Sequence, residues 1–471
     1  MKFSKSFALS VVCAAILAGC GGDDGKNGID GTNGADGADG TNGVSVLVTS
    51  ADVITTNAQH AYAVYSDSLI AAKALKEQLE VFVAAPTDEN FTKAKEAWLD
   101  AREPYGQSEV YRFREGPIDA LTKNEEGSWT LVPDEGPEGR INAWPLAEAL
   151  IDYTISMGGT ELPEDATNLS LGGNLIASEN ENYAAINREL LTKVAQESDP
   201  ETVQSAFAFG SDDRNVRSGY HAIEFLLWGQ DLNGNGKYEA QRDYTAGHRK
   251  ASDYFTDVGT CTSEGIVQTE ERTCTRRGQY LLESAKLLVE DLNNVTDAWT
   301  PGQGFHYMAF THADNTQSAL NKILTGMGEL SLGELSAERI QKSYDANSQE
   351  DEHSCFSDNT HRDIYLNAKG IQNTFLGEYT RFSGEALAGA SLYDLLVVKG
   401  HAELANKLRA ALEDTMAKAS VIDTTAKLGS SFDIQIQENE FRPAIKATMD
   451  ALAAQTNVIE EVMATLEVTN P

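Results

Sequence analysis

The chain has 471 residues and is strongly acidic, with 37 lysines and arginines against 72 aspartates and glutamates and a net charge of −35. This acidity disfavours nucleic acids and anionic lipid headgroups as partners, because both bind basic surfaces. Hydrophobic residues make up 41% of the chain and charged residues 23%, a balance typical of folded proteins. Eleven prolines and five cysteines exclude a proline-rich fibre and a disulfide-rich miniprotein.

The first twenty residues have the pattern of a targeting signal. Two lysines precede an apolar stretch over residues 7–18 that is too short to span a bilayer. It leads to the letters LAGC at 17–20, which resemble the lipobox of bacterial lipoproteins. The resemblance implies that residues 1–19 are removed, that Cys20 is acylated, and that the protein is anchored at the outer membrane, on its periplasmic face or at the cell surface. An ordinary signal peptide is the alternative.

A glycine-rich segment follows the predicted lipid anchor. Glycine recurs at every third position from Gly25 to Gly43, as a collagen triple helix requires. The run has no proline and carries several aspartates, which favours a flexible, solvated tether over residues 20–49. A collagen-like stalk is the alternative.

The cysteines further along the chain predict one disulfide. Cys261 and Cys274 lie in a polar stretch with twelve residues between them, and in an oxidising envelope we expect them to be bonded to each other. Cys355 is then left over, and a buried inert thiol is its simplest interpretation.

From about residue 50 the spacing of apolar residues is helical. It predicts a helix from Ala61 to Ala85 and a second from Phe91, capped by Thr87 or Asp88. Further helices are expected over 145–157, 187–197, 213–229, 278–292, 314–324, 335–344, 364–377, 402–420 and 438–466. No run alternates with the period of a strand. The sequence therefore predicts an all-α protein of two packed helical-bundle domains, residues 50–240 and 241–471, that face each other.

One of these helices carries a histidine and a glutamate at a spacing suited to a metal. His221 and Glu224 are three residues apart, so the imidazole and the carboxylate project from one face of a helix. Helical bundles build metal sites from such pairs, with further carboxylates from neighbouring helices. Gly219, at the start of this motif, allows another part of the chain to come close. An exposed ion pair on a helix surface is the alternative.

The surroundings of this motif resemble the imelysin family, in particular its iron-regulated protein A-like branch. The resemblance extends from about residue 50 to the C-terminus and rests on the segments AWLDAREP at 97–104, GRINAWPL at 139–146, GYHAIE at 219–224, WGQD at 228–231 and EDEHSCFSDNTH at 350–361. It implies an envelope protein of paired helical bundles that is linked to bacterial iron uptake. The founding member, the insulin-cleaving membrane protease, was assigned a peptidase activity.

Carried over to this chain, the family motif places His221 and Glu224 at the site. Glu109 is the first candidate for an added carboxylate ligand, and a solvated helix glutamate is its alternative. Arg102 could hold a carboxylate in place or bind an anion, or it could form a surface ion pair.

The second half of the chain contains another set of candidate ligands. Glu350 and His353 are again three residues apart, in reverse order, and Asp358 and His361 repeat the spacing. If this stretch is helical, its side chains would face the first set across the domain interface. A polar loop whose acids cap helices is the alternative.

Two activities compete for this site. A zinc peptidase needs a metal-bound water and a general base, and it would show two histidines one turn apart with a glutamate beside the first. No glutamate lies beside His221, and a carboxylate-rich site suits iron better than hydrolytic zinc. We therefore expect a lipid-anchored protein that binds iron, with zinc as second choice, and that acts with partner proteins of iron uptake. A metallopeptidase and a surface adhesin on a collagen-like stalk are the alternatives.

Overall fold

The computed structural model describes residues 47–124, 126–153, 174–179, 183–192, 216–231, 245–263, 266–268 and 271–468. The predicted signal peptide, the lipid-bearing Cys20, the tether up to residue 46 and the domain boundary near residue 240 lie outside these ranges. From Leu47 onward the chain forms a single folded unit.

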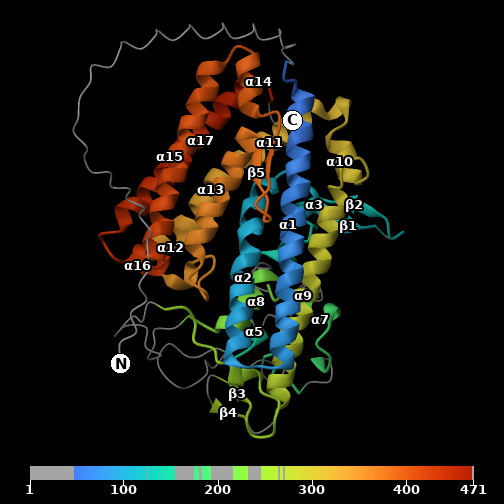
Figure 1. Ribbon diagram of the computed structural model, residues 1–471, viewed down its shortest axis with the longest axis vertical. Coiled ribbons are helices and arrows are strands. Elements are labelled where there is room, and N and C mark those ends of the chain that lie inside the picture. The colour runs from blue at the N-terminus through green and yellow to red at the C-terminus, as the bar shows by residue number, and fades with distance from the viewer. Residues whose placement is uncertain are drawn as a thin grey trace, which may run out of the picture. The chain divides into compact units, whose positions relative to one another are not determined.

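A first bundle is built from helices of both halves of the sequence. It contains α1 (Ser50–Ala84), α2 (Asp88–Ser108), α8 (Gly219–Trp228) and α9 (Arg272–Ala298). Helix α1 packs against α2 and α9, and α8 contacts both α2 and α9 (Figure 1). The starts of the two N-terminal helices follow from capping: Thr49 forms a capping box with Asp52, and the Thr87 hydroxyl accepts from the backbone N–H of Asn90.

A second bundle is formed by the C-terminal part of the chain. It contains α11 (Thr316–Glu329), the π-helix η7 (Leu330–Gln341), α13 (Thr360–Leu376), α15 (Ala402–Lys427) and α17 (Arg442–Thr465). Helix α15 packs against both α13 and α17, and α17 contacts η7 (Figure 1). Helix α13 also packs on α2 and so joins the two bundles.

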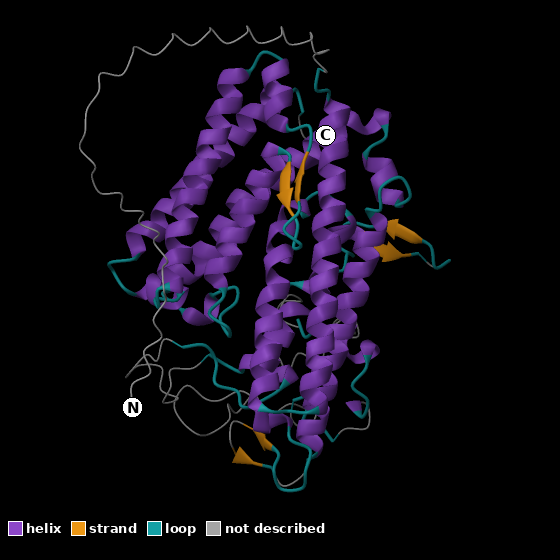
Figure 2. Cartoon of the chain, in the orientation of Figure 1, coloured by secondary structure: helices purple, strands orange, loops and turns teal. Residues whose placement is uncertain are grey.

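The remaining elements are short. They are η1 (Glu109–Tyr111), α3 (Pro117–Ala120), α4 (Glu138–Ile141), α5 (Glu148–Ile151), α7 (Arg188–Thr192), η5 (Ala251–Tyr254), α10 (Phe305–Phe310), η6 (Ala313–Asn315), α12 (Lys342–Ala346), η8 (Gln349–Asp351), α14 (Leu392–Val398) and α16 (Phe432–Gln437). The strands form antiparallel pairs, namely β1 (Leu121–Lys123) with β2 (Trp129–Leu131), β3 (Thr262–Ser263) with β4 (Ile266–Val267), and β5 (Glu378–Thr380) with β6 (Ala386–Ala388). Helices dominate the described chain (Figure 2), so the all-α prediction is confirmed.

Three expected helices differ markedly from those observed. The helix expected over residues 145–157 is confined, within the described ranges, to Glu148–Ile151. The helices expected at 314–324 and 335–344 are continuous, because α11 passes directly into η7 and α12. Gly326 does not interrupt this helix. It provides space, because a Cβ there would lie 2.7 Å from the carbonyl oxygen of Val110 and would collide with the Arg114 side chain.

The main hydrophobic core spans both bundles. It includes Val53 of α1, Trp98 of α2, Leu281 of α9, Phe375 of α13 and Ile459 of α17, all nearly inaccessible to solvent. No helix in the described part of the chain is both long enough and apolar enough to cross a bilayer.

The structure joins Cys261 to Cys274, with their Cα atoms 5.8 Å apart. The bond ties the β3 strand region to the first turn of α9. Cys355 is free and buried.

Candidate functional site

The glycine of the His/Glu motif sits where no other residue fits well. Gly219 begins α8 with a φ of +86°, and a Cβ there would collide with the backbone carbonyl oxygens of Arg140 and Ile141. All ten residues of α8 are buried. The helix is therefore an interior element, and the side chains of His221 and Glu224 project into the protein.

His221 and Glu224 form a buried hydrogen-bonded pair. The Nδ1 atom of His221 and the Oε2 atom of Glu224 lie 2.9 Å apart, and both side chains are completely buried. The other carboxylate oxygen, Oε1, accepts from the backbone N–H of Ser357 at 3.0 Å and from its hydroxyl at 2.6 Å. The alternative of an exposed helix ion pair is excluded by this burial.

The second half of the chain contributes His353 to the same place. The rings of His221 and His353 are 4.6 Å apart, centroid to centroid, at an interplanar angle of 79°. Nδ1 of His353 lies 2.8 Å from Oδ2 of Asp363, which also accepts from the Ser354 hydroxyl at 2.6 Å. Two imidazoles from distant parts of the chain therefore meet, and each is bound through Nδ1 to its own carboxyl group.

Burial keeps both imidazoles neutral. It lowers the pKa of His221 well below its usual value, and the neighbouring His353 and Arg102 lower it further. Burial, together with Arg339, also lowers the pKa of His353. Among the described residues, Nε2 of His221 is a buried nitrogen with no hydrogen-bond partner.

The pKa values of Glu224 and Asp363 are shifted in opposite directions. Burial raises the pKa of Glu224 to about 8, although the hydrogen bonds from Ser357 oppose this shift. Burial also opposes ionisation of Asp363, but Arg102 and His353 outweigh it and hold the pKa of Asp363 well below its usual range. At neutral pH Glu224 therefore carries a proton and Asp363 is ionised.

Arg102 holds Asp363 in place. Its side chain is 1% exposed, and its Nη2 atom lies 2.8 Å from Oδ1 of Asp363. It also donates to the side-chain oxygen of Asn142. The alternative of a surface ion pair is therefore excluded, and Arg102 acts on the site through a carboxylate.

Glu109 lies in a neighbouring network of charges. Its carboxylate accepts from Arg339 at 2.6 Å, from Asn142 at 3.1 Å and from Arg112 at 3.3 Å. Burial opposes ionisation, but Arg339 and Arg112 prevail and lower the pKa of Glu109 to about 2. Glu109 is thus a buried ion-pair partner connected to Arg102 through Asn142.

Glu350 has a different neighbour from the one expected. It lies in the short 3-10 helix η8, which ends at Asp351, so Glu350 and His353 do not share a helix face. Burial and Asp351 raise the pKa of Glu350 to about 7. Burial, and then Glu350, likewise raise the pKa of Glu148. His361 donates from Nδ1 to the backbone oxygen of Asp358 at 2.9 Å.

A cavity of about 500 Å³ borders the buried pair. Ser357 is half-buried, lines this cavity and donates to Glu224, so it separates the cavity from the carboxyl group. The cavity is also lined by Leu99, Glu103, Asp358, Asn359, His361, Arg362, Ala426, Lys427, Gly429 and Ser431.

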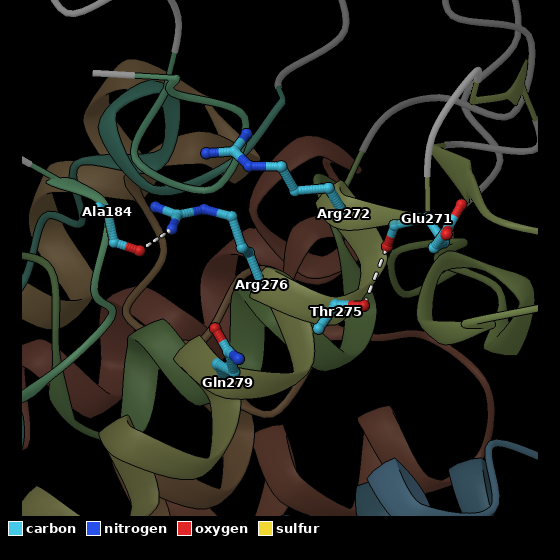
Figure 3. Close-up of a pocket in the computed structure, with 6 residues that line it drawn as sticks. All are labelled: Ala184, Glu271, Arg272, Thr275, Arg276 and Gln279. Atoms are coloured by element: carbon cyan, nitrogen blue, oxygen red, sulfur yellow. Dashed lines mark hydrogen bonds between the residues drawn. The ribbon is translucent and has the colours of Figure 1, made fainter. Parts of the chain in front are cut away.

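A separate cavity, of about 600 Å³, lies at the start of α9. There Arg276 donates to the carbonyl oxygen of Ala184 at 2.7 Å, and the Thr275 hydroxyl donates to that of Glu271 (Figure 3). Arg276 also bonds the carbonyl oxygens of Leu175, Ile176 and Tyr183. Its guanidinium therefore ties these segments to α9.

Sequence reasoning missed Asp363, Asn142 and Ser357. Asn142 and Ser357 lie inside the segments that carry the family resemblance, and this position was the one sequence feature that could have indicated a role at the site. Asp363 lies ten residues after His353 and 261 after Arg102, and no local spacing connects these three residues. Within the described ranges, no three His, Cys, Asp or Glu side chains are arranged to hold a metal ion together.

A family model described as imelysin matches residues 61–459. The chain belongs to the imelysin family. The family expected from the sequence is therefore confirmed. No curated protein matches the chain.

Two solved structures share the imelysin-type fold. An iron-regulated protein A precursor from Parabacteroides distasonis is 16% identical, with a TM-score of 0.56, over 89% of this chain and 96% of that one. An imelysin-like protein from Psychrobacter arcticum is 13% identical, with a TM-score of 0.51, over 90% of this chain and all of that one. At these identities the likeness concerns the fold.

Proposed function

We propose that the protein is an envelope-anchored lipoprotein that binds iron between His221 and His353 and serves in iron uptake. One observation carries the proposal: two neutral imidazoles lie 4.6 Å apart, and each is held through Nδ1 by a carboxyl group. Histidines that bind metals generally donate their other ring N–H to a carboxylate or a carbonyl group in this way. Glu224 and Asp363 would then orient the ligands, which revises the expectation that Glu224 is itself a ligand.

Two properties of His221 support the proposed metal binding. Nε2 of His221 is buried without a hydrogen-bond partner among the described residues, and burial keeps the ring neutral at physiological pH. Loss of the Glu224 proton would let Nδ1–H of His221 donate to the carboxylate and would leave the Nε2 lone pair available. With two protein nitrogens, the other coordination positions fall to water or to a small chelating molecule.

Iron is preferred over zinc because of a structural neighbour. Imidazole nitrogen suits both metals, so the residues alone accommodate either. The name of one structural neighbour contains "iron-regulated", and that protein shares this fold over nearly its whole length. Metal would reach the site from the cavity beside Ser357, the half-buried residue that donates to Glu224.

The metallopeptidase alternative has less support. A peptidase must bring a peptide bond to a metal-bound water. His221 and Glu224 are completely buried, which leaves no room for a polypeptide beside them. The adhesin alternative depends on the glycine-rich segment, which lies outside the described residues.

The envelope location rests on the lipobox at residues 17–20 and on the disulfide. Disulfides persist in oxidising compartments such as the bacterial periplasm, and Cys261 is bonded to Cys274. Radiolabelled palmitate fed to expressing cells tests the anchor: label should enter the wild-type chain and be lost in Cys20→Ala.

Metal analysis of the purified mature chain tests the binding. We expect about one iron per chain in the wild type, and its loss in both His221→Ala and His353→Ala. His401→Ala, at an exposed histidine before α15, should retain the metal. Equal metal content in all four proteins would contradict the proposal. Peptide cleavage that His221→Ala abolishes would favour the peptidase.

A further inference from the structure

Arg114 is a buried guanidinium without a carboxylate partner. Its side chain donates to Oδ1 of Asn57 at 2.9 Å and lies 4.8 Å from the centre of the Tyr111 ring, and the residue is 3% exposed. Among the described residues, its Nε and Nη2 atoms have no hydrogen-bond partner, and no ion pair within 4.0 Å involves the guanidinium. Arg102 and Arg277, by contrast, are each paired with an aspartate.

The backbone around Arg114 is shaped to hold the side chain inward. Its neighbours Phe113 and Glu115 both have positive φ values, 59° and 50°, which are costly for residues other than glycine. In α11, a Cβ on Gly326 would collide with the Arg114 side chain. Three positions thus accept conformational or packing constraints that keep this cation in the interior.

Two further hydrogen-bond donors without a partner lie around the same aromatic ring. The Tyr65 hydroxyl and the Trp299 indole N–H are fully buried, and neither has a partner within the described residues. The rings of Tyr65 and Trp299 lie 6.1 Å and 6.4 Å from that of Tyr111. Three side chains therefore bring N–H and O–H groups, and no carboxylate, to one interior region.

None of the nearby titratable groups in the described ranges forms an ion pair with the Arg114 guanidinium. Burial lowers the pKa of Arg114 to about 10, so the guanidinium is still charged at neutral pH. Burial likewise lowers the pKa of His306 to about 3, which leaves that ring neutral. The acid that acts on Arg114 is Asp119, whose carboxyl lies 3.7 Å from Arg112; burial raises its pKa to about 7.

We propose that the protein binds a small monovalent anion, of the size of chloride, between Arg114, Tyr65 and Trp299. A buried charge needs a counter-charge, and buried donors need acceptors. An anion that only accepts hydrogen bonds meets both needs, whereas water would bring two donors of its own. This site is distinct from the His221/His353 pair and does not depend on the proposed iron binding.

The test compares unfolding in sodium chloride and in sodium gluconate at equal ionic strength, on the metal-free mature chain. Gluconate is too large for a buried site and serves as the reference. Above the dissociation constant, each tenfold rise in chloride should raise the folding equilibrium constant tenfold, which corresponds to about 1.4 kcal/mol. Equal stability of the wild type in both salts at all concentrations would overturn the proposal.

Three variants assign the effect to this site. Arg114→Met should lose the chloride dependence, and in gluconate it should be no less stable than the wild type, because an unpaired buried charge is removed. Trp299→Phe should weaken the dependence. Trp98→Phe is the matched control, since its indole N–H already donates to the backbone oxygen of Tyr220 at 2.9 Å, and it should respond to chloride as the wild type does. An unchanged chloride response in Arg114→Met and Trp299→Phe would also overturn the proposal.

Discussion

Two buried polar clusters differ in how completely they are bonded. Arg277 donates to both carboxylate oxygens of Asp152, at 2.7 Å and 3.1 Å, to the backbone oxygens of Asp253 and Thr262, and to the Ser263 hydroxyl. All five of its N–H groups are used. In the His221/His353 pair, by contrast, both rings are neutral and His221 Nε2 has no partner in the described structure.

The difference separates a stabilising cluster from one able to accept a ligand. Satisfied buried charges hold a fold together and leave nothing for another molecule to bind. A neutral, incompletely bonded pair contributes less to folding and keeps a nitrogen available. Mutations in the first cluster should therefore change stability, and those in the second should change metal binding.

The largest effect is expected for Arg277→Met. The change leaves Asp152 buried with Arg249 as its remaining partner, and breaking a buried ion pair in this way costs about 3–5 kcal/mol. The free energy of unfolding, measured with urea, should fall by that amount. Metal content of the folded fraction should not change, and a loss of metal without a loss of stability would break the comparison.

Glu224→Gln should act mainly on metal affinity. Ser357 donates to Oε1, so the amide oxygen must face Ser357 and the amide NH₂ must face His221. This arrangement favours the tautomer in which Nε2 of His221 carries the proton. We expect a loss in metal affinity of about 10–100-fold, measured by competition with a chelator of known affinity.

The matched control for this variant is Glu80→Gln. Glu80 is half exposed and pairs with Lys76 on the surface of α1, so metal affinity should be unaffected. Equal losses in both variants would show that the effect of Glu224→Gln is not local.

The pH dependence of metal binding should report the Glu224 proton. Because burial raises the pKa of Glu224 to about 8, metal binding below that pH must release its proton. Affinity should fall by up to tenfold per pH unit as the pH drops below about 8. The raised pKa also affects the stability of the metal-free protein, which should be higher at low pH. The stability contributed by neutral Glu224 is complete below pH 4.5 and is lost as the pH rises through about 8. Glu224→Gln should remove both dependences.

The smallest effect is expected for Ser357→Ala. The variant keeps the backbone N–H bond to Glu224 and loses the hydroxyl bond of 2.6 Å. That hydroxyl lowers the pKa of Glu224, so its loss should raise the pKa and weaken metal binding several-fold at pH 7. A matched change at Ser431, which lines the same cavity, should leave the affinity unchanged.

Much of the fold could be predicted from local patterns. The helices near residues 61–85 and 402–420, the cap at Thr87 and the shared face of His221 and Glu224 all depend on neighbours within one or two turns. The predicted ends of the helices were less accurate. The helix through Gly326 is continuous, because this glycine leaves space for the Arg114 side chain and does not end the helix.

The contacts that complete the candidate site could not be predicted. Glu109 was expected beside the His/Glu pair, but it is bonded to Arg339, which lies 230 residues further along the chain. His353 was expected to act with Glu350, yet it is bonded to Asp363. Such pairings depend on how η1, η7 and α13 pack, and the spacing of residues along the chain carries no information about that.

The amino-acid sequence by itself determined the helical class and the face on which His221 and Glu224 lie, because helix periodicity and capping act over a few residues. The family followed from the resemblance of short segments such as that at residues 219–224. The tertiary structure alone decided which groups are buried, which carboxylates are paired and which carry a proton. Those properties follow from desolvation and from charges brought together across long stretches of chain. Arg102, 261 residues from Asp363, keeps that carboxyl group ionised, whereas burial keeps Glu224 protonated against the hydrogen bonds of Ser357, 133 residues away.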